Sequence, residues 1–336
     1  MRFALSAERL AFAASLHDLL AAADTPAVAR GFAAGDYEPG RTLWKRLAEL
    51  GVAALTVPER WGGLDAGPVD VVVAFEELGH HAVPGPVVES AAAAIVLAES
   101  GVTTWLTDLA RGEVMASVAL PPHVPYALDA SVAAPVLAVE HDALSRVDAT
   151  GGARSAAMSS VDPARRLFTV TGGEVLARGE EVRRAAAHAF ELGALATAAQ
   201  MLGAGRALLE MATGHAKARV QFGRPVGSFQ AVKHRLADVY VALELARPLL
   251  FGAAIAVADR SEAAARDVSA AKVACAEAAY RAARAALQVH GAVGYTRECD
   301  LGLWLTKVRA LMSAWGTGTV HRARVRAALA GREVRR

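Results

Sequence analysis

The sequence predicts a mainly helical protein with a small β domain in its middle. The chain has 336 residues, of which 54% are hydrophobic and only 6% aromatic, and Ala is abundant. This composition suits close-packed helices better than a large sheet. The hydrophobic period changes near Met115 and again near Ala185. We therefore expect an N-terminal helical domain (1–114), a reduced β domain (115–180) and a C-terminal four-helix bundle (181–336).

The first third is typical of amphipathic helices. Apolar residues recur at helical spacing over 3–24, 42–50 and 68–78. Gly51 is expected to end the second of these helices. A turn-rich loop, Val57–Leu64, precedes the third.

Short apolar runs replace the helical pattern after Met115. They cover 116–120, 132–139, 144–147 and 167–170, and Pro, Gly, Asp and Ser separate them. Runs of this length between turn residues predict strands.

The last part returns to helices. One expected helix carries a core stripe, with Val239 and Leu243 among its members, and Pro248 is expected to kink it. Another is expected over Ser269–His290, with Val273, Tyr280 and Leu287 buried.

A corner, Arg219–Gln230, interrupts the long helices. Its Gly-Arg-Pro and Val-Gly-Ser segments break the helix, and Ser228 is the expected N-cap of the next one. Arg219 offers planar donors suited to phosphate, and Gln230 can pair with a nucleotide edge. On these residues alone, a plain helix corner with a surface arginine remains the alternative.

Three motifs together resemble the acyl-CoA dehydrogenase family. They are the corner with Arg219, Phe222, Gly223, Phe229 and Gln230, a Pro-Glu-x-Trp-Gly-Gly loop followed by a Glu-Glu-Leu-Gly helix end, and a Gln-x-x-Gly-x-x-Gly-Tyr segment that begins at Gln288. The resemblance implies that FAD is the cofactor and that much of it belongs to a neighbouring subunit. The residues implied to touch it are Arg219, Phe222, Gln230, Gln288, Gly291 and Thr317.

The chain departs from this family in the β domain. The Thr-Glu-Pro, Gly-Ser-Asp and Lys-x-Trp-Ile motifs that hold the flavin ring in relatives are absent, and Pro121–Pro125 stands where the first would be. This puts the chain's own hold on an isoalloxazine ring in doubt.

Both positions that carry the catalytic base in relatives lack a base here. Removal of the α proton of a thioester needs a carboxylate close by. Matching the Gly-Thr segment puts Trp315 at the usual position, and Gly193 stands at the other. Glu191 lies two residues from Gly193, and two residues turn a side chain by about 200° around a helix. Glu191 is therefore expected to face away unless the register slips.

The resemblance thus favours one half of a mixed assembly, similar to the short subunits of actinobacterial heterotetrameric acyl-CoA dehydrogenases. A second, Glu-bearing subunit would hold the flavin ring and an acyl-CoA, steroid-derived by resemblance alone, and a flavoprotein or similar carrier would accept the electrons. The alternatives are a non-catalytic scaffold and a self-sufficient enzyme that uses Glu191 or another acid-base group.

Other classes of function find little support. The net charge of +2 gives no case for nucleic acid. His80-His81 has no metal-ligand spacing and is expected to serve a helix C-terminus, so no metal is expected. Gly203-Ala204-Gly205 lies in a helical pattern, which argues against a dinucleotide loop. Two cysteines without redox spacing, no signal peptide and no pure apolar run predict a cytoplasmic protein without a membrane span.

Overall fold

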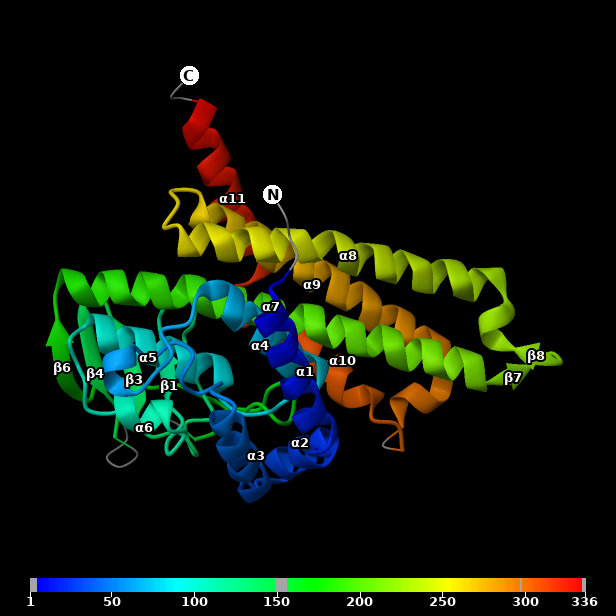
Figure 1. The fold of residues 1–336 in the computed structure, drawn as a ribbon, viewed down its shortest axis with the longest axis horizontal. Helices are drawn as coiled ribbons and strands as arrows, with labels where there is room; N and C mark the ends of the chain where they lie inside the picture. Colours follow the sequence, from blue (N-terminus) through cyan, green and yellow to red (C-terminus); the bar gives the residue numbers. More distant parts are fainter. Residues whose placement is uncertain (1–4, 149–155, 297, 334–336) are drawn as a thin grey trace.

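A computed structural model describes residues 5–148, 156–296 and 298–333, with side chains placed through residue 331. Helices form the N-terminal part, short strands the middle and long helices the C-terminal part (Figure 1). The predicted fold class, mainly helical with a small sheet region, is confirmed.

The N-terminal helices surround one side of the long C-terminal helices. They are α1 (Ala7–Ala21), α2 (Thr25–Ala34), α3 (Glu38–Glu49), α4 (Pro68–His80), α5 (Val87–Glu99) and α6 (Leu106–Ala110), with a 3₁₀ turn η1 (Glu59–Trp61). Local sequence sets their ends. The Asp24 carboxylate accepts the Ala27 N–H at 3.3 Å to start α2, and Gly35, with φ of 87°, ends it.

The middle region holds two small sheets. Their strands are β1 (Ser117–Ala119), β2 (Ala127–Leu128), β3 (Val136–Glu140), β4 (Ala143–Arg146), β5 (Leu167–Phe168) and β6 (Glu174–Arg178). The larger sheet has the order β1-β3-β4-β6. β1 runs parallel to β3, with Val118 opposite Leu137, and the other pairs are antiparallel. β2 and β5 form a separate antiparallel pair.

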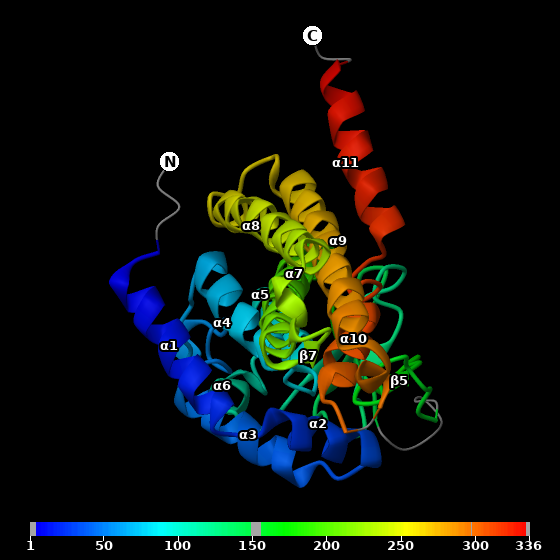
Figure 2. The same cartoon turned by 90° about the vertical axis from the view of Figure 1, so that its right-hand side faces the viewer.

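The centre of the molecule is α7 (Glu180–Ala218), which packs against α4, α5, α8 (Gln230–Ala258) and α9 (Ala264–His290) (Figure 2). Facing glycines bring α4 and α7 into backbone contact. A Cβ on Gly203 would lie 1.8 Å from the Glu76 carbonyl oxygen, and one on Gly79 would lie 2.1 Å from that of Gln200. Gly203 therefore serves helix packing, as its helical context predicted.

The remaining elements complete the C-terminal part. They are the hairpin strands β7 (Val220–Gln221) and β8 (Arg224–Pro225), the 3₁₀ turns η2 (Val226–Ser228) and η3 (Gly291–Tyr295), and the helices α10 (Leu301–Leu311) and α11 (Gly318–Glu333). The hairpin protrudes at one end of the long helices, and α11 extends away from the body (Figures 1 and 2).

Two local predictions are wrong. Ser228 ends the turn η2, and the N-cap of α8 is Phe229, with no side-chain cap bond. Tyr280 is 42% exposed, and Val273 and Leu287 are only half-buried. The buried face of α9 consists largely of alanines, so its larger side chains point outward.

The expectation that no segment is apolar enough for a membrane span also needs correction. By length and composition alone, α7 and α8 are both long and apolar enough to cross a membrane, with mean hydropathies of 1.2 and 1.8 in their most apolar windows. In α7, 89% of that window is buried inside the protein, as in the central helix of a bundle. In α8 the share is 39%.

Candidate functional site

The corner between α7 and α8 folds as a tight β-hairpin. Val220 pairs with Pro225 and Gln221 with Arg224, which leaves Phe222 and Gly223 as the two-residue turn. Both have positive φ, 54° and 76°, as a type I′ turn requires. A phenylalanine rarely adopts such a backbone conformation. Here its ring is 90% exposed at the tip.

Aromatic and cationic side chains gather behind this tip. The Arg224 guanidinium lies over the Phe229 ring at 4.1 Å, and Phe222 meets that ring edge-on at 6.2 Å. Arg219 and Gln230 are exposed at the base of the hairpin. Among the described residues, the Arg219 guanidinium has no hydrogen-bond or ion-pair partner. Its donors are thus free for an anion outside the chain.

The end of α9 joins this group. The His215 ring on α7 stacks on the His290 ring on α9 with centroids 4.3 Å apart, which brings the two helix ends together. Gln288 is exposed in the last turn of α9, and Gly291, with φ of 65°, ends the helix. Five of the six predicted cofactor residues therefore lie at one end of the bundle.

This donor set fits the ADP part of FAD. A free guanidinium suits a pyrophosphate, exposed amides suit the edges of a nucleotide, and an exposed aromatic ring offers a stacking surface. When bound, FAD would supply a hydride acceptor. The chain's own residues at this end would hold its phosphate and nucleotide part.

The sixth predicted residue, Thr317, lies elsewhere. It stands one residue before α11, where its hydroxyl accepts the Val320 N–H at 3.4 Å, and it lines a cavity with Trp315. Trp315 contacts α7 at Gly193. With a rise of 1.5 Å per residue, Gly193 lies about 37 Å along the helix from the end of α7 that leads into the hairpin. The structure therefore separates Thr317 from the other five.

Trp315 and Gly193, predicted to occupy the two base positions, are in direct contact. A Cβ on Gly193 would lie 2.1 Å from the indole Cε3, so the ring fills the space beside this glycine. Trp315 is 2% exposed, and its φ of 55° is unusual for a large side chain. Its indole Nε1 donates to Glu89 Oε1 at 3.2 Å.

Glu89 is a candidate functional residue that the sequence analysis missed. It lies in α5, is 4% exposed and lines the same cavity of about 450 Å³ as Trp315. Burial raises the pKa of this carboxyl, and the nearby Arg165 opposes the rise. Glu89 stands just before an apolar run of the same helix, Ala91–Leu97, and no sequence motif marks it as functional.

The predicted alternative base, Glu191, has a partner. Arg324 of α11 donates to both of its carboxylate oxygens and also to the Ser269 hydroxyl at 3.1 Å. His321 contacts the same hydroxyl at 3.1 Å and the Trp315 carbonyl at 2.9 Å. This network fixes Glu191 as an ion-pair partner of α11.

The wall of the cavity that the β region supplies is largely apolar. Pro122, Val124 and Pro125 line it at the place where the sequence lacks the first flavin-ring motif. Leu128 and Leu167, from β2 and β5, continue the wall. The polar side chains of His123, Ser160 and Arg165 interrupt it.

Comparisons with known proteins agree with the fold and the motifs. The family described as "Acyl-CoA dehydrogenase, N-terminal domain" matches residues 6–113. The family described as "Acyl-CoA dehydrogenase, C-terminal domain" matches residues 183–330.

Individual relatives match over most of their length. Acyl-CoA dehydrogenase IpdE2 of Mycobacterium tuberculosis (strain ATCC 25618 / H37Rv) is 33% identical over 89% of this chain and 90% of its own. IpdE2 of Mycolicibacterium smegmatis (strain ATCC 700084 / mc(2)155) is also 33% identical, over 81% of this chain and 82% of its own.

Two solved structures share the fold. A chain of the ChsE4-ChsE5 complex from Mycobacterium tuberculosis superposes with a TM-score of 0.85 at 25% identity, covering 98% of this chain and 99% of that one. A chain of a Tcur3481-Tcur3483 steroid ACAD variant also gives 0.85, at 23% identity, covering 97% and 99%.

Proposed function

The chain belongs to the acyl-CoA dehydrogenase family, whose members are FAD-dependent oxidoreductases acting on CH–CH groups, and on that premise we propose that it is one subunit of a heteromeric enzyme. In this proposal it supplies part of an FAD site, and a related partner subunit supplies the catalytic Glu and holds the flavin ring.

The observation that carries the proposal is the contact between Trp315 and Gly193. Relatives place a carboxylate at one of these two positions, whereas here an indole fills the space of both. An indole N–H donates hydrogen bonds and cannot take a proton from a thioester α carbon. The nearby Glu191 is held by Arg324. In this proposal, a carboxylate from another chain takes the proton that neither Trp315 nor Gly193 can take.

The hairpin end supports the other half of the proposal. Arg219, Phe222, Gln230 and Gln288 are exposed and point to a ligand beyond the chain. The guanidinium would neutralise phosphate charge, and the amides would fix the nucleotide's orientation. The chain thus binds and orients, while proton removal belongs to the partner.

The outer face of α8 supports assembly. Four large apolar side chains on it are exposed, namely Tyr240, Val241, Leu245 and Leu249. Water-exposed apolar faces of this kind are typical of protein interfaces. The similar ChsE4-ChsE5 structure is itself a complex of two named chains. A steroid-derived CoA thioester is the substrate that the sequence resemblance suggests for the assembly.

The test is the flavin stoichiometry of the chain purified alone and with its genomic neighbour. We expect the chain alone to lack FAD, and the pair to carry one FAD per two chains and to oxidise acyl-CoA. In the pair, Arg219→Ala should lower the FAD content, while Arg41→Ala, an exposed arginine on α3, should leave it unchanged. A non-catalytic scaffold predicts full FAD content in Arg219→Ala.

A self-sufficient flavoenzyme is the second candidate, because Glu89 places a carboxyl with a raised pKa in the Trp315 cavity. This function predicts a yellow chain that oxidises acyl-CoA without a partner and loses that activity in Glu89→Gln. Turnover by the purified chain alone would overturn the shared-site proposal.

A further inference from the structure

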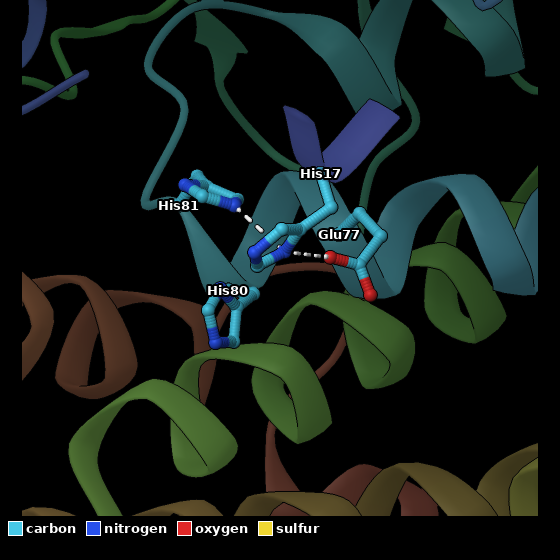
Figure 3. Close-up of side chains that lie close together, drawn as sticks. All are labelled: His17, Glu77, His80 and His81. Atoms are coloured by element: carbon cyan, nitrogen blue, oxygen red, sulfur yellow. Dashed lines mark hydrogen bonds and ion pairs between the residues drawn. The ribbon is translucent and has the colours of Figure 1, made fainter. Parts of the chain in front are cut away.

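Three histidines and a glutamate converge between α1 and α4. His17 comes from α1, and Glu77 and His80 come from the last turn of α4, which His81 follows directly (Figure 3). One side-chain donor atom from each lies within 4.8 Å of the others. The three imidazole rings are tilted by 51–65° to one another, with centroids 4.8–5.3 Å apart. The rings do not stack on one another.

The hydrogen bonds of this cluster cannot all be satisfied by protons alone. His17 Nδ1 lies 3.1 Å from Glu77 Oε2 and 3.2 Å from His81 Nε2. This nitrogen can carry only one proton, and a carboxylate only accepts. If His17 Nδ1 carries a proton and donates it to Glu77 Oε2, His81 Nε2 can at best share that hydrogen bond. If His81 Nε2 instead donates to an unprotonated His17 Nδ1, the lone pair of Nδ1 faces a lone pair of Glu77 Oε2.

His80 adds a third electron pair to the same place. Its Nε2 lies 2.9 Å from Glu210 Oε2, so in the neutral tautomer the proton sits on Nε2. Nδ1 is then unprotonated. It is buried and has no hydrogen-bond partner among the described residues, and the His80 residue is only 8% exposed. Unpaired buried nitrogens are costly, and His80 is one of the four converging residues.

We propose that His17, Glu77, His80 and His81 form a binding site for a divalent transition-metal cation, with Zn²⁺ the best match. Three imidazoles and one carboxylate oxygen are a donor set that Zn²⁺ accepts in four-coordinate sites. Donors of a tetrahedral zinc site stand about 3.3 Å apart, given bonds of about 2.0 Å. The two closest pairs already have this spacing, at 3.1 and 3.2 Å, and the others, which lie within 4.8 Å, must approach by up to about 1.5 Å.

The surroundings match those of a metal site. The Glu210 carboxylate on His80 Nε2 is the outer partner that orients metal-bound histidines. His81 Nε2 lies 3.2 Å from His17 Nδ1, so its ring directs a nitrogen into the cluster. Within the described part of the chain, Arg206 is the one adverse charge that contacts a ligand: it donates to Glu77 Oε1 at 3.1 Å and does not contact Oε2. Its charge is also met by Glu76. His17 is 44% exposed at the side chain, which gives the cation a path from solvent.

Sequence spacing hides this site because its ligands come from two helices. His80-His81 alone has no ligand pattern, and His17 joins it only when α1 packs on α4. The bound cation would tie α1 to the rest of the molecule through α4.

The experiment uses the full chain without an affinity tag, in the assembly that it forms, stripped with a chelator and then titrated with Co²⁺. We expect one Co²⁺ per chain, visible absorption typical of four-coordinate Co²⁺, and displacement by Zn²⁺. Zn²⁺ should also raise the melting temperature of the stripped protein. None of these measurements depends on FAD, so they can fail or succeed independently of the proposed function.

Variants separate this site from adventitious binding. His17→Gln should abolish the Co²⁺ spectrum, and because His17 is half-exposed the variant should keep its circular dichroism. Glu210→Gln should weaken binding by about 10–100-fold through the loss of the outer partner. His188→Gln, which removes an exposed histidine paired with Glu99, is the matched control and should bind normally. Absence of saturable binding, or equal binding by His17→Gln, would overturn the proposal.

Discussion

At the scale of single residues, Gly193 and Trp315 depend on each other. The indole lies where any side chain on Gly193 would project, and its Nε1 is satisfied by the buried Glu89. A glycine in the middle of a helix costs about 1 kcal/mol relative to alanine, so the contact must compensate for it. The indole thus occupies the space directly beside this glycine.

Gly193→Ala tests this packing. The added methyl group would lie 2.1 Å from the ring, so we expect a loss of about 1–3 kcal/mol in the free energy of unfolding, measured in urea. Gly214→Ala on the same helix has open space around it and should be neutral or stabilising by up to about 1 kcal/mol. Equal stability of the two variants would show that Trp315 does not fill this space.

His321 makes stability depend on pH. Burial lowers its pKa to about 4, below the usual 6.5; the hydrogen bond to the Trp315 carbonyl opposes this shift, and the nearby charges of Lys272 and Arg324 add to it. Between pH 6.5 and 4 the unfolded chain binds a proton that the folded chain does not, so stability should fall as the pH falls. His81 shifts in the same direction.

The measurement is the melting temperature of the chelator-treated protein at several pH values between about 7 and 4. His321→Gln should lower the melting temperature at pH 7, and it should make the melting temperature depend less on pH. An unchanged slope in the variant would contradict the role given to His321.

At the scale of elements, the β7–β8 hairpin combines an unfavourable backbone with an exposed ring. Phe222 adopts positive φ at a turn position that suits Asn or Gly, and its ring is 90% exposed. Neither feature stabilises this chain. Such a conformation points to a role beyond folding, and the proposed contact with the cofactor would supply one.

Phe222→Asn should separate folding from function. Asn tolerates the left-handed conformation, so we expect an equal or higher melting temperature for the chain. The FAD content of the co-purified complex, measured by flavin absorbance, should fall because the aromatic surface is lost. Phe222→Tyr keeps the ring and should keep the FAD. If Asn retained full FAD content, Phe222 would have no part in the site.

At the scale of the whole molecule, the two candidate functional regions lie at different places on α7. The hairpin stands at its C-terminal end, and the Trp315 cavity lies beside its first half. The helix α8, whose exposed face carries large apolar side chains, runs alongside α7 (Figure 1). A partner on that face would also come near the hairpin that begins α8.

Leu245→Asp tests the assembly. Leu245 is 67% exposed, so the change should leave the stability of the chain within about 0.5 kcal/mol. It should nevertheless prevent co-purification with the partner subunit, because a charge would be buried in the interface. Leu10→Asp, at a 56% exposed position on α1, is the control and should assemble normally. Normal assembly of Leu245→Asp would place the interface elsewhere.

Local patterns determined much of this protein from sequence alone. The helical period, the strand-length runs and the glycines of the corner identified the fold class, because each depends on residues close in the chain. The corner, Gln288 and Gly291 were likewise visible as motifs, and the lack of a carboxylate at Trp315 and Gly193 followed from matching two segments. The boundaries of local features were less secure: the N-cap fell on Phe229 and not on Ser228.

Only the tertiary structure decided which distant side chains meet. The alanine-rich face of α9 turned Tyr280 outward, because small residues allow the closest helix packing. In the folded chain, Glu89 accepts a hydrogen bond from Trp315, and Arg324 forms an ion pair with Glu191. His17 lies beside His80 and His81. Sequence spacing carries no record of such contacts, since they arise from packing between elements far apart in the chain. The motifs therefore determined the family, and the packing determined what its sites can do.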